Sequence, residues 1–288
     1  MNDSMRRLLS GLVDYAGLFP PAALPMGDAV ANYAAYRASA DAWVLGRFVV
    51  PVNRLEEFEA ELAGHPAGEP WRLSVLAQAG DADAIRSFNA RSVGRAFIDS
   101  VEARAQTVDD VTALAPLAWI GAVYVEIPVG DDPDALVRAI GARAFRAKIR
   151  TGGVTPAAFP SPADVARVLA ACARHGVAFK ATAGLHHPLR GEYPLTYASD
   201  AALGTMFGYL NLFVAAMFLR HGMPEADAAA LLGERDASAI PFDATGVRWR
   251  GHALGAREVA DARAQFALSF GSCSFREPID DLSALQPT

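Results

Sequence analysis

The sequence predicts a single (β/α)8 barrel, and three observations support this fold class. Strand-like and helix-like segments alternate along the 288 residues in eight units, with neither an internal repeat nor a linker. The hydrophobic fraction of 52% is enough for one large core. No glycine-rich G-x-G-x-x-G motif follows the early strands, which disfavours the main alternative, an open doubly wound sheet. We therefore expect one domain over residues 1–288.

Short apolar runs predict the strands, and amphipathic segments between them predict the helices. The strands are expected at 12–16, 43–50, 72–78, 95–103, 122–129, 145–152, 178–185 and 246–254. The helices are expected at 28–39, 53–64, 81–92, 109–118, 132–143, 161–176, from 207 onward, and at 256–270. Ser161 and Asp164 resemble a capping pair that opens the sixth helix. The insert 188–206 is the longest connection without periodicity, and we expect it to be a mouth loop that acts as a lid.

The composition of the chain excludes some classes of binding partner and indicates the cellular compartment. The net charge of −6 argues against nucleic acid or an anionic membrane as a partner. Cys172 and Cys273 are too few and too far apart for a disulfide framework, so we expect a cytoplasmic protein. The first residues show no clear signal peptide, and the apolar run 207–219 is too short to span a bilayer.

Two lysines stand out because every other basic residue is an arginine. The chain has 26 Lys plus Arg, and only Lys148 and Lys180 are lysine. They fall late in the sixth and seventh predicted strands, so both are expected to point into the barrel mouth. Lysine, unlike arginine, can lose its proton when it is buried. A simpler interpretation, two snorkelling or salt-bridged lysines at strand ends, stays open.

The proximity of the two lysines suggests a specific chemistry. Two neighbouring ammonium groups repel each other, and an apolar wall adds a cost of desolvation, so both effects are expected to lower a lysine pKa. A neutral amine attacks a carbonyl carbon, and the product is a Schiff base. The sequence therefore predicts an enzyme that acts on a small carbonyl substrate and needs no cofactor.

The two lysine segments read Lys-Ile-Arg-Thr-Gly at 148–152 and Lys-Ala-Thr-Ala-Gly at 180–184. This region, about 145–185, resembles the deoxyribose-phosphate aldolases, whose sixth and seventh strands carry Lys-Thr-Ser-Thr-Gly and Lys-Ala-x-Gly-Gly. The resemblance implies that Lys148 forms the carbinolamine and the Schiff base, and that Lys180 is its electrostatic partner. It also implies an acid on strand four that relays protons, for which Asp99 is the best match.

The substrate is expected to carry an anionic group, either carboxylate or phosphate. Arg150 replaces a small hydroxyl residue of the family, and by period two it shares one face of the strand with Lys148. Its guanidinium can bind a planar anion through two hydrogen bonds, with Arg190 or Arg250 as candidate helpers. The motif residues expected to contact substrate are Thr151, Gly152 and Thr182.

His186 and His187 are expected where strand seven meets the insert. His186 shares the face of Lys180, so it is a candidate substrate-binding or acid–base residue, and a hydrogen-bonding loop histidine is the alternative. A metal site that combines His186 with Glu192, Asp14 or Glu126 has no ligand spacing to support it, so no metal is expected.

Three further residues carry weaker expectations. Glu126, near the end of strand five, is a candidate catalytic residue or one partner of a structural ion pair. Asp14, at the mouth end of strand one, is a candidate relay residue or part of a simple turn. Cys273 follows the last predicted helix, and we expect it to pack away from the mouth.

The preferred hypothesis is a Schiff-base aldolase or lyase that uses Lys148 as its nucleophile. One alternative is an enolising lyase or isomerase without a covalent intermediate, with or without the assistance of a metal. Another is a non-catalytic barrel that binds an anion. The run 207–219 is apolar on nearly all sides and predicts cover by a second subunit, hence a homo-oligomer.

Overall fold

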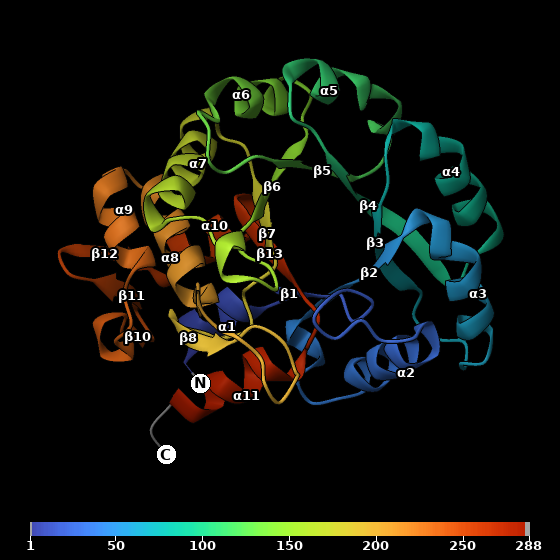
Figure 1. Ribbon diagram of the computed structural model, residues 1–288, viewed down its shortest axis with the longest axis horizontal. Helices are drawn as coiled ribbons and strands as arrows, with labels where there is room; N and C mark the ends of the chain where they lie inside the picture. The colour runs from blue at the N-terminus through green and yellow to red at the C-terminus, as the bar shows by residue number, and fades with distance from the viewer. Residues whose placement is uncertain (1, 286–288) are drawn as a thin grey trace.

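Eight parallel strands close into a barrel surrounded by helices in the computed structural model, which describes residues 2–285 (Figure 1). Each strand pairs with the next along the chain, and the last barrel strand closes the circle between the seventh and the first. The barrel strands are β1 (Val13–Tyr15), β2 (Leu45–Pro51), β3 (Trp71–Leu76), β4 (Ala96–Arg104), β5 (Ala122–Ile127), β6 (Arg146–Arg150), β7 (Phe179–Thr182) and β13 (Ala267–Ser272). The predicted (β/α)8 barrel is confirmed.

The helices pack around the outside of the barrel (Figure 1). They are α1 (Asp3–Leu9), α2 (Met26–Arg37), α3 (Leu55–Ala63), α4 (Ala82–Arg91), α5 (Val108–Ala113), α6 (Asp134–Ala142), α7 (Pro162–His175), α8 (Tyr209–Arg220), α9 (Glu225–Leu232), α10 (Ala256–Gln265) and α11 (Arg276–Leu285). The predicted cap of α7 is confirmed, because the Ser161 side chain accepts a hydrogen bond of 3.1 Å from the Asp164 backbone N–H. The same helix ends at His175 and is capped by Gly176, whose φ of 64° is a left-handed conformation that glycine adopts readily.

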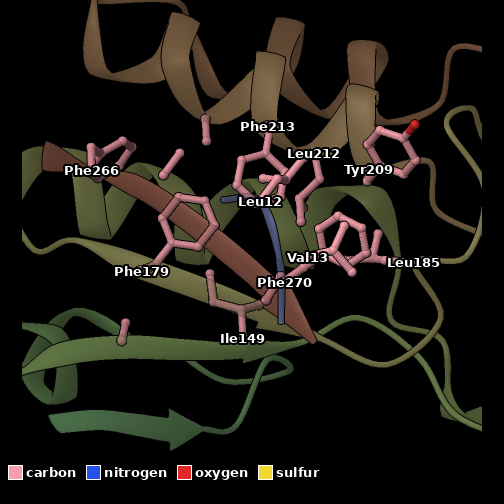
Figure 2. Close-up of a cluster of buried hydrophobic side chains, with 14 of the residues drawn as sticks. Leu12, Val13, Ile149, Phe179, Leu185, Tyr209, Leu212, Phe213, Phe266 and Phe270 are labelled. Atoms are coloured by element: carbon pink, nitrogen blue, oxygen red, sulfur yellow. The ribbon is translucent and has the colours of Figure 1, made fainter. Parts of the chain in front are cut away.

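An aromatic cluster attaches the outer face of β7 and β13 to α8 (Figure 2). Phe179 on β7 stacks on Phe213 of α8 with 6.0 Å between ring centroids, and Phe266 lies edge-on to Phe179 at 5.4 Å. Phe270 on β13 stacks on Tyr209 at 5.3 Å. Because side chains alternate along a strand, the residues between these aromatics point into the barrel. This alternation puts Lys180 and Ser269 inside.

The eighth strand is not where the sequence analysis placed it. The predicted strand 246–254 forms an antiparallel hairpin outside the barrel, made of β11 (Gly246–Trp249) and β12 (His252–Gly255), with β10 (Phe242–Asp243) at its edge. Arg250 and Gly251 form its two-residue turn, which fits the positive φ of 48° at Arg250. The eighth barrel strand is β13, which the prediction had included in a helix that ends at Gln265.

Helix α8 is buried on all sides by this chain itself. Every residue from Tyr209 to Leu219 is buried, and α8 packs against α7, α9, α10 and the β12 hairpin strand. The apolar surface that predicted a second subunit is therefore already covered, which corrects that argument and leaves a homo-oligomer as a prediction without this support.

The insert 188–206 is more regular than expected. It forms a two-stranded antiparallel hairpin of β8 (Gly191–Pro194) and β9 (Leu203–Met206). Leu195 and Met206, from this hairpin and its turn, line the cavity described below. None of the helices within residues 2–285 is both long enough and apolar enough to cross a bilayer.

Arg263 on α10 joins the start of β13 to the segment that precedes β1, the two strands that close the barrel. Its buried guanidinium donates hydrogen bonds to the carbonyl oxygens of Leu8 (2.6 Å), Ser10 (3.0 Å), Ala267 and Leu268.

We expect Arg263→Met to lower the free energy of unfolding by about 3 kcal/mol, because buried carbonyls lose their donor. Urea unfolding measures the change. Arg257→Met, on the same helix with a side chain that is 96% exposed, is the control and should change stability little. Equal effects of the two substitutions would contradict this role.

Candidate active site

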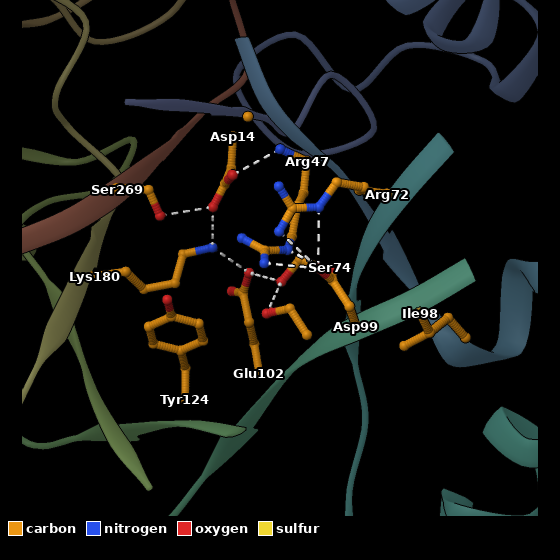
Figure 3. Close-up of polar contacts among 12 residues, drawn as sticks. Asp14, Arg47, Arg72, Ser74, Ile98, Asp99, Glu102, Tyr124, Lys180 and Ser269 are labelled. Carbon is orange, nitrogen blue, oxygen red and sulfur yellow. Dashed lines mark hydrogen bonds and ion pairs between the residues drawn. The ribbon is translucent and has the colours of Figure 1, made fainter. Parts of the chain in front are cut away.

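A cluster of polar side chains fills the interior of the barrel (Figure 3). Seven strands contribute side chains to the connected network: Asp14 (β1), Ser74 (β3), Ser100 and Glu102 (β4), Glu126 (β5), Lys148 (β6), Lys180 (β7) and Ser269 (β13). All of them are buried except Glu126, which is partly buried. Buried charges are costly unless they are paired, so this network must be closely balanced.

Glu102 is the centre of the network. Its carboxylate lies 2.8 Å from the Lys148 ammonium through Oε2 and 2.6 Å from the Lys180 ammonium through Oε1. Ser74 donates a further hydrogen bond of 2.7 Å to Oε1. Burial alone would raise the pKa of Glu102, but the two ammonium groups outweigh burial and lower it. Glu102 is therefore held as a carboxylate between two cations.

Lys180 is enclosed by two carboxylates. Its ammonium lies 2.6 Å from Asp14 Oδ2 as well as from Glu102, and Ser269 donates to the same oxygen of Asp14 at 2.8 Å. Burial lowers the pKa of Lys180, but Asp14 and Glu102 reverse this and raise it above its ordinary value. The expectation of mutual repulsion is wrong for Lys180, because a carboxylate separates it from Lys148.

Lys148 sits between Glu102 and a second carboxylate. Its ammonium lies 2.8 Å from Glu126 Oε2, and Arg150 donates from Nε to the other oxygen of Glu126 at 3.1 Å. Burial would raise the pKa of Glu126, but Lys148 and then Arg150 outweigh it and lower the pKa. The Lys148 side chain is only 5% exposed. This small exposed part faces the cavity.

A cavity of about 280 Å³ lies above the lysine pair. Its apolar walls include Phe19, Pro20, Val49, Leu76, Leu195 and Met206. The polar side chains on its lining are Glu102, Lys148, Arg150, Thr182, His186 and Cys273. Lys180 does not line it, so only Lys148 offers an amine to a molecule in this space. Mostly apolar walls with a few convergent polar groups are typical of a small-molecule site.

The structure brings some of the predicted site residues together and excludes others. Arg150, Thr182 and His186 line the cavity with Lys148, and Glu126 lies directly behind Lys148. Thr151 does not line it, because its hydroxyl is buried and donates to the Ala183 carbonyl at 2.7 Å. The predicted contact at Gly152 is replaced by packing, since an added Cβ there would lie 2.4 Å from the Phe159 ring.

Two predicted arginines lie elsewhere. Arg250 is in the turn of the outer hairpin and stacks on Trp249 at 4.2 Å, so it cannot help Arg150 bind an anion. Arg190 stacks on Phe207 at 4.6 Å, and it is not among the residues that line the cavity.

Asp99 is not the strand-four acid of this site, and Glu102 takes that position. A β-bulge interrupts the pairing of β3 with β4, so that Ile98 pairs with Leu73 but Ser100 pairs with Ser74. Asp99 is skipped and forms ion pairs with Arg47 (2.6 Å) and Arg72 (2.7 Å), as Figure 3 shows. A usable signal was present in the sequence, because Glu102 lies nearer the carboxyl end of the strand than Asp99.

Cys273 also differs from the expectation. It follows β13, the true eighth strand, and so reaches the cavity lining instead of packing away from the mouth. Burial raises the pKa of its thiol. Asp14, expected as a relay residue or as part of a turn, lies on β1 and is an ion-pair partner of Lys180. Within residues 2–285, no group of three or more His, Cys, Asp or Glu side chains is arranged to hold a metal ion.

A scan against protein-family models and a search of curated proteins found no match to this chain. Among solved structures, a lysine/ornithine decarboxylase complexed with cadaverine from Vibrio vulnificus is similar over 62% of this chain, with 12% sequence identity and a TM-score of 0.39. The similarity spans 49% of that protein, about half of its length. A likeness of this extent concerns neither the site nor the reaction.

Replacing the central carboxylate tests how the network is balanced. We expect Glu102→Gln to lower the free energy of unfolding by about 3–5 kcal/mol, because it leaves buried ammonium groups underpaired. Since the pKa of Glu102 is lowered in the folded chain, its contribution is complete above the ordinary glutamate pKa of about 4.3 and is lost as the pH falls below it. Urea unfolding should show a constant difference from about pH 5 to pH 8 that shrinks below about pH 4.

Glu57→Gln is the matched control for this substitution. Glu57 forms an exposed pair with Arg54, at 2.7 Å, and its loss should have little effect on stability. A Glu102→Gln variant as stable as the wild type at pH 7 would contradict the central role of this carboxylate.

Proposed function

We propose that this barrel is an enzyme that forms a Schiff base between Lys148 and a small carbonyl compound. The observation that carries the proposal is the position of Lys148 at the base of an apolar cavity, between Glu102, which stays ionised, and Glu126, which can take and return its proton. Lys180, in contrast, is shielded from the cavity and held charged. The chemistry is therefore assigned to one of the two lysines.

The first steps follow from the contacts of Lys148. Glu126 accepts a proton from the ammonium, and the freed amine attacks the carbonyl carbon. The carbonyl oxygen takes up protons and leaves as water, which gives a protonated imine. The second carboxylate stabilises this cation, as it stabilises the ammonium before reaction.

A protonated imine accepts electrons from a neighbouring C–C or C–H bond. An aldolase or lyase reaction uses this property when it breaks or forms the bond between the carbons α and β to the imine carbon. The cavity volume of about 280 Å³ suits a compound of a few carbons with an apolar part. Arg150 is 43% exposed at the cavity and suits a carboxylate or phosphate on that compound.

A second candidate is proton transfer without a covalent intermediate, as in an isomerase or enolising lyase. The ion pairs of Lys148 with Glu102 and Glu126 favour it, because they stabilise the charged ammonium. In this reaction the ammonium binds the carbonyl oxygen and a carboxylate removes the adjacent proton. The two candidates differ in whether a bond to Lys148 forms.

Borohydride trapping distinguishes the two candidates. We expect a panel of small aldehydes, ketones and 2-oxo acids with borohydride to add mass to the peptide that contains Lys148, because reduction fixes the imine. Lys148→Arg should abolish the adduct, since arginine does not deprotonate. Lys180→Arg keeps the charge and should leave the adduct in place. An unmodified Lys148 at every pH tried would reject the Schiff base and favour the proton-transfer reaction.

The anion prediction concerns Arg150. We expect Arg150→Lys to weaken binding of 2-oxo acids about tenfold or more, because lysine cannot form the paired hydrogen bonds of a guanidinium. Binding is measured as the concentration dependence of trapping, with acetone as the uncharged comparison. Urea unfolding should change little, since the side chain is partly exposed. Equal effects on acetone and on 2-oxo acids would contradict a carboxylate site at Arg150.

A further inference from the structure

The carbon–carbon step of the proposed reaction needs a group that exchanges a proton with a substrate oxygen. Five ionisable side chains line the cavity. Lys148 is occupied by the imine, Arg150 stays cationic, and Glu102 is held ionised by two ammonium groups. Burial raises the pKa of the Cys273 thiol, so it stays protonated. Histidine is the side chain that ordinarily gains and loses a proton near neutral pH, which leaves His186.

His186 is held by Glu277, which lies far along the chain and is itself held by Tyr197 of the insert. Its Nδ1 lies 2.9 Å from Glu277 Oε2 on α11, and the hydroxyl of Tyr197 in the insert donates to that same oxygen at 2.8 Å. The His186 side chain is 9% exposed. Because the Glu277 carboxylate accepts from Nδ1, the neutral ring carries its proton there and leaves Nε2 unprotonated. Within the described residues, Nε2 makes no hydrogen bond.

The groups that face His186 come from every side of the cavity. Glu277 and Asp281 lie on α11, with Asp281 bound to the neighbouring His187. Tyr197 comes from the insert and contacts Cys273 Sγ at 3.6 Å. The barrel contributes Lys148, Arg150 and Glu102 to the same cavity. The burial of Glu277 raises its pKa, but its hydrogen bonds from His186 and Tyr197 outweigh burial and lower the pKa, so it stays ionised.

We propose that His186, oriented by Glu277 and Tyr197, is the general acid–base that moves a proton at the substrate oxygen farther from Lys148. The proposal rests on the imine chemistry at Lys148 and specifies its substrate class, a β-hydroxy carbonyl compound or the pair of carbonyl compounds that forms it. In cleavage, Nε2 accepts the hydroxyl proton, and the oxygen electrons form a new C=O bond. The C–C bond breaks, and its electron pair converts the protonated imine into an enamine. In bond formation, the imidazolium returns the proton to the new alkoxide.

Glu277 and Tyr197 are positioning residues in this account. They fix which ring nitrogen carries the proton, and Glu277 stabilises the imidazolium after proton transfer. His187 provides a matched control, because it pairs with Asp281 on the same helix but does not line the cavity. Its ring stacks on Tyr193 at 3.5 Å instead.

The test measures two reactions on the same variants. Borohydride trapping with acetaldehyde, acetone and pyruvate reports the imine at Lys148. Release of these compounds from the corresponding β-hydroxy carbonyl compounds reports C–C cleavage. We expect His186→Gln to keep trapping at the wild-type level and to reduce cleavage by about 100- to 10,000-fold, the range for loss of a general acid–base. His187→Gln should retain both reactions.

The pH profile of cleavage separates positioning from a structural role. Glu277→Gln removes the anion beside the imidazolium, so the acid limb of the profile should move to lower pH, and the maximal rate should fall while trapping persists. Tyr197→Phe should slow cleavage and leave the extent of borohydride trapping at Lys148 unchanged.

Each outcome decides between the two proposals. Trapping together with wild-type cleavage in His186→Gln would overturn the role of His186 and leave the Schiff base standing. Absence of trapping in the wild type with every probe would overturn the Schiff base, and the role of His186 with it. Wild-type profiles in Glu277→Gln would limit Glu277 to a structural contact.

Discussion

The bridge that Glu102 makes between Lys148 and Lys180 is the interaction on which the interior of this barrel depends. Two buried ammonium groups on adjacent strands would be strongly destabilising without an anion between them. Glu102 lies within 2.8 Å of both, and Asp14 and Glu126 complete the balance on either side. The network has three carboxylates for two lysines, and Arg150 on Glu126 compensates the third. Lys180 is thereby fixed in the interior, and Lys148 is left as the amine at the cavity.

Much of this arrangement follows from strand periodicity. Period two places Lys148, Arg150 and Lys180 inside the barrel once the strands are located, and the fold follows from the alternation of strands with helices.

Three features of the structure do not follow from strand periodicity. The β-bulge at Asp99 breaks period two, so Glu102 and not Asp99 faces the lysines. The hairpin at 246–255 has the same apolar pattern as a barrel strand, and only its antiparallel pairing distinguishes it from β13. The partners of His186 are also hidden, because Glu277 lies far along the chain and is joined to it only in the folded state.

The site divides into two parts with different origins. The barrel strands supply the charged floor of the cavity, where ion pairs cross the barrel interior from β7 to β1 and β4 and from β6 to β4. The insert and α11 supply the rim, where Tyr197 and Glu277 meet at His186. In the proposed reaction Lys148 at the floor of the cavity forms the imine, and His186 at the rim transfers the second proton. Rigid barrel strands suit the first task, and a hairpin that lines the cavity with Leu195 and Met206 suits the exclusion of water from the second.

The most direct measurement uses the fact that the chain has two lysines. Protein labelled with ¹³C at the lysine Cε should give two NMR signals, which Lys148→Arg assigns. The account predicts that a small carbonyl compound shifts the Lys148 signal to an imine position, without borohydride, while the Lys180 signal stays at that of an ammonium group. A shift of the Lys180 signal to an imine position would contradict the assignment. If neither signal moved with any aldehyde, ketone or 2-oxo acid, the Schiff base itself would be rejected.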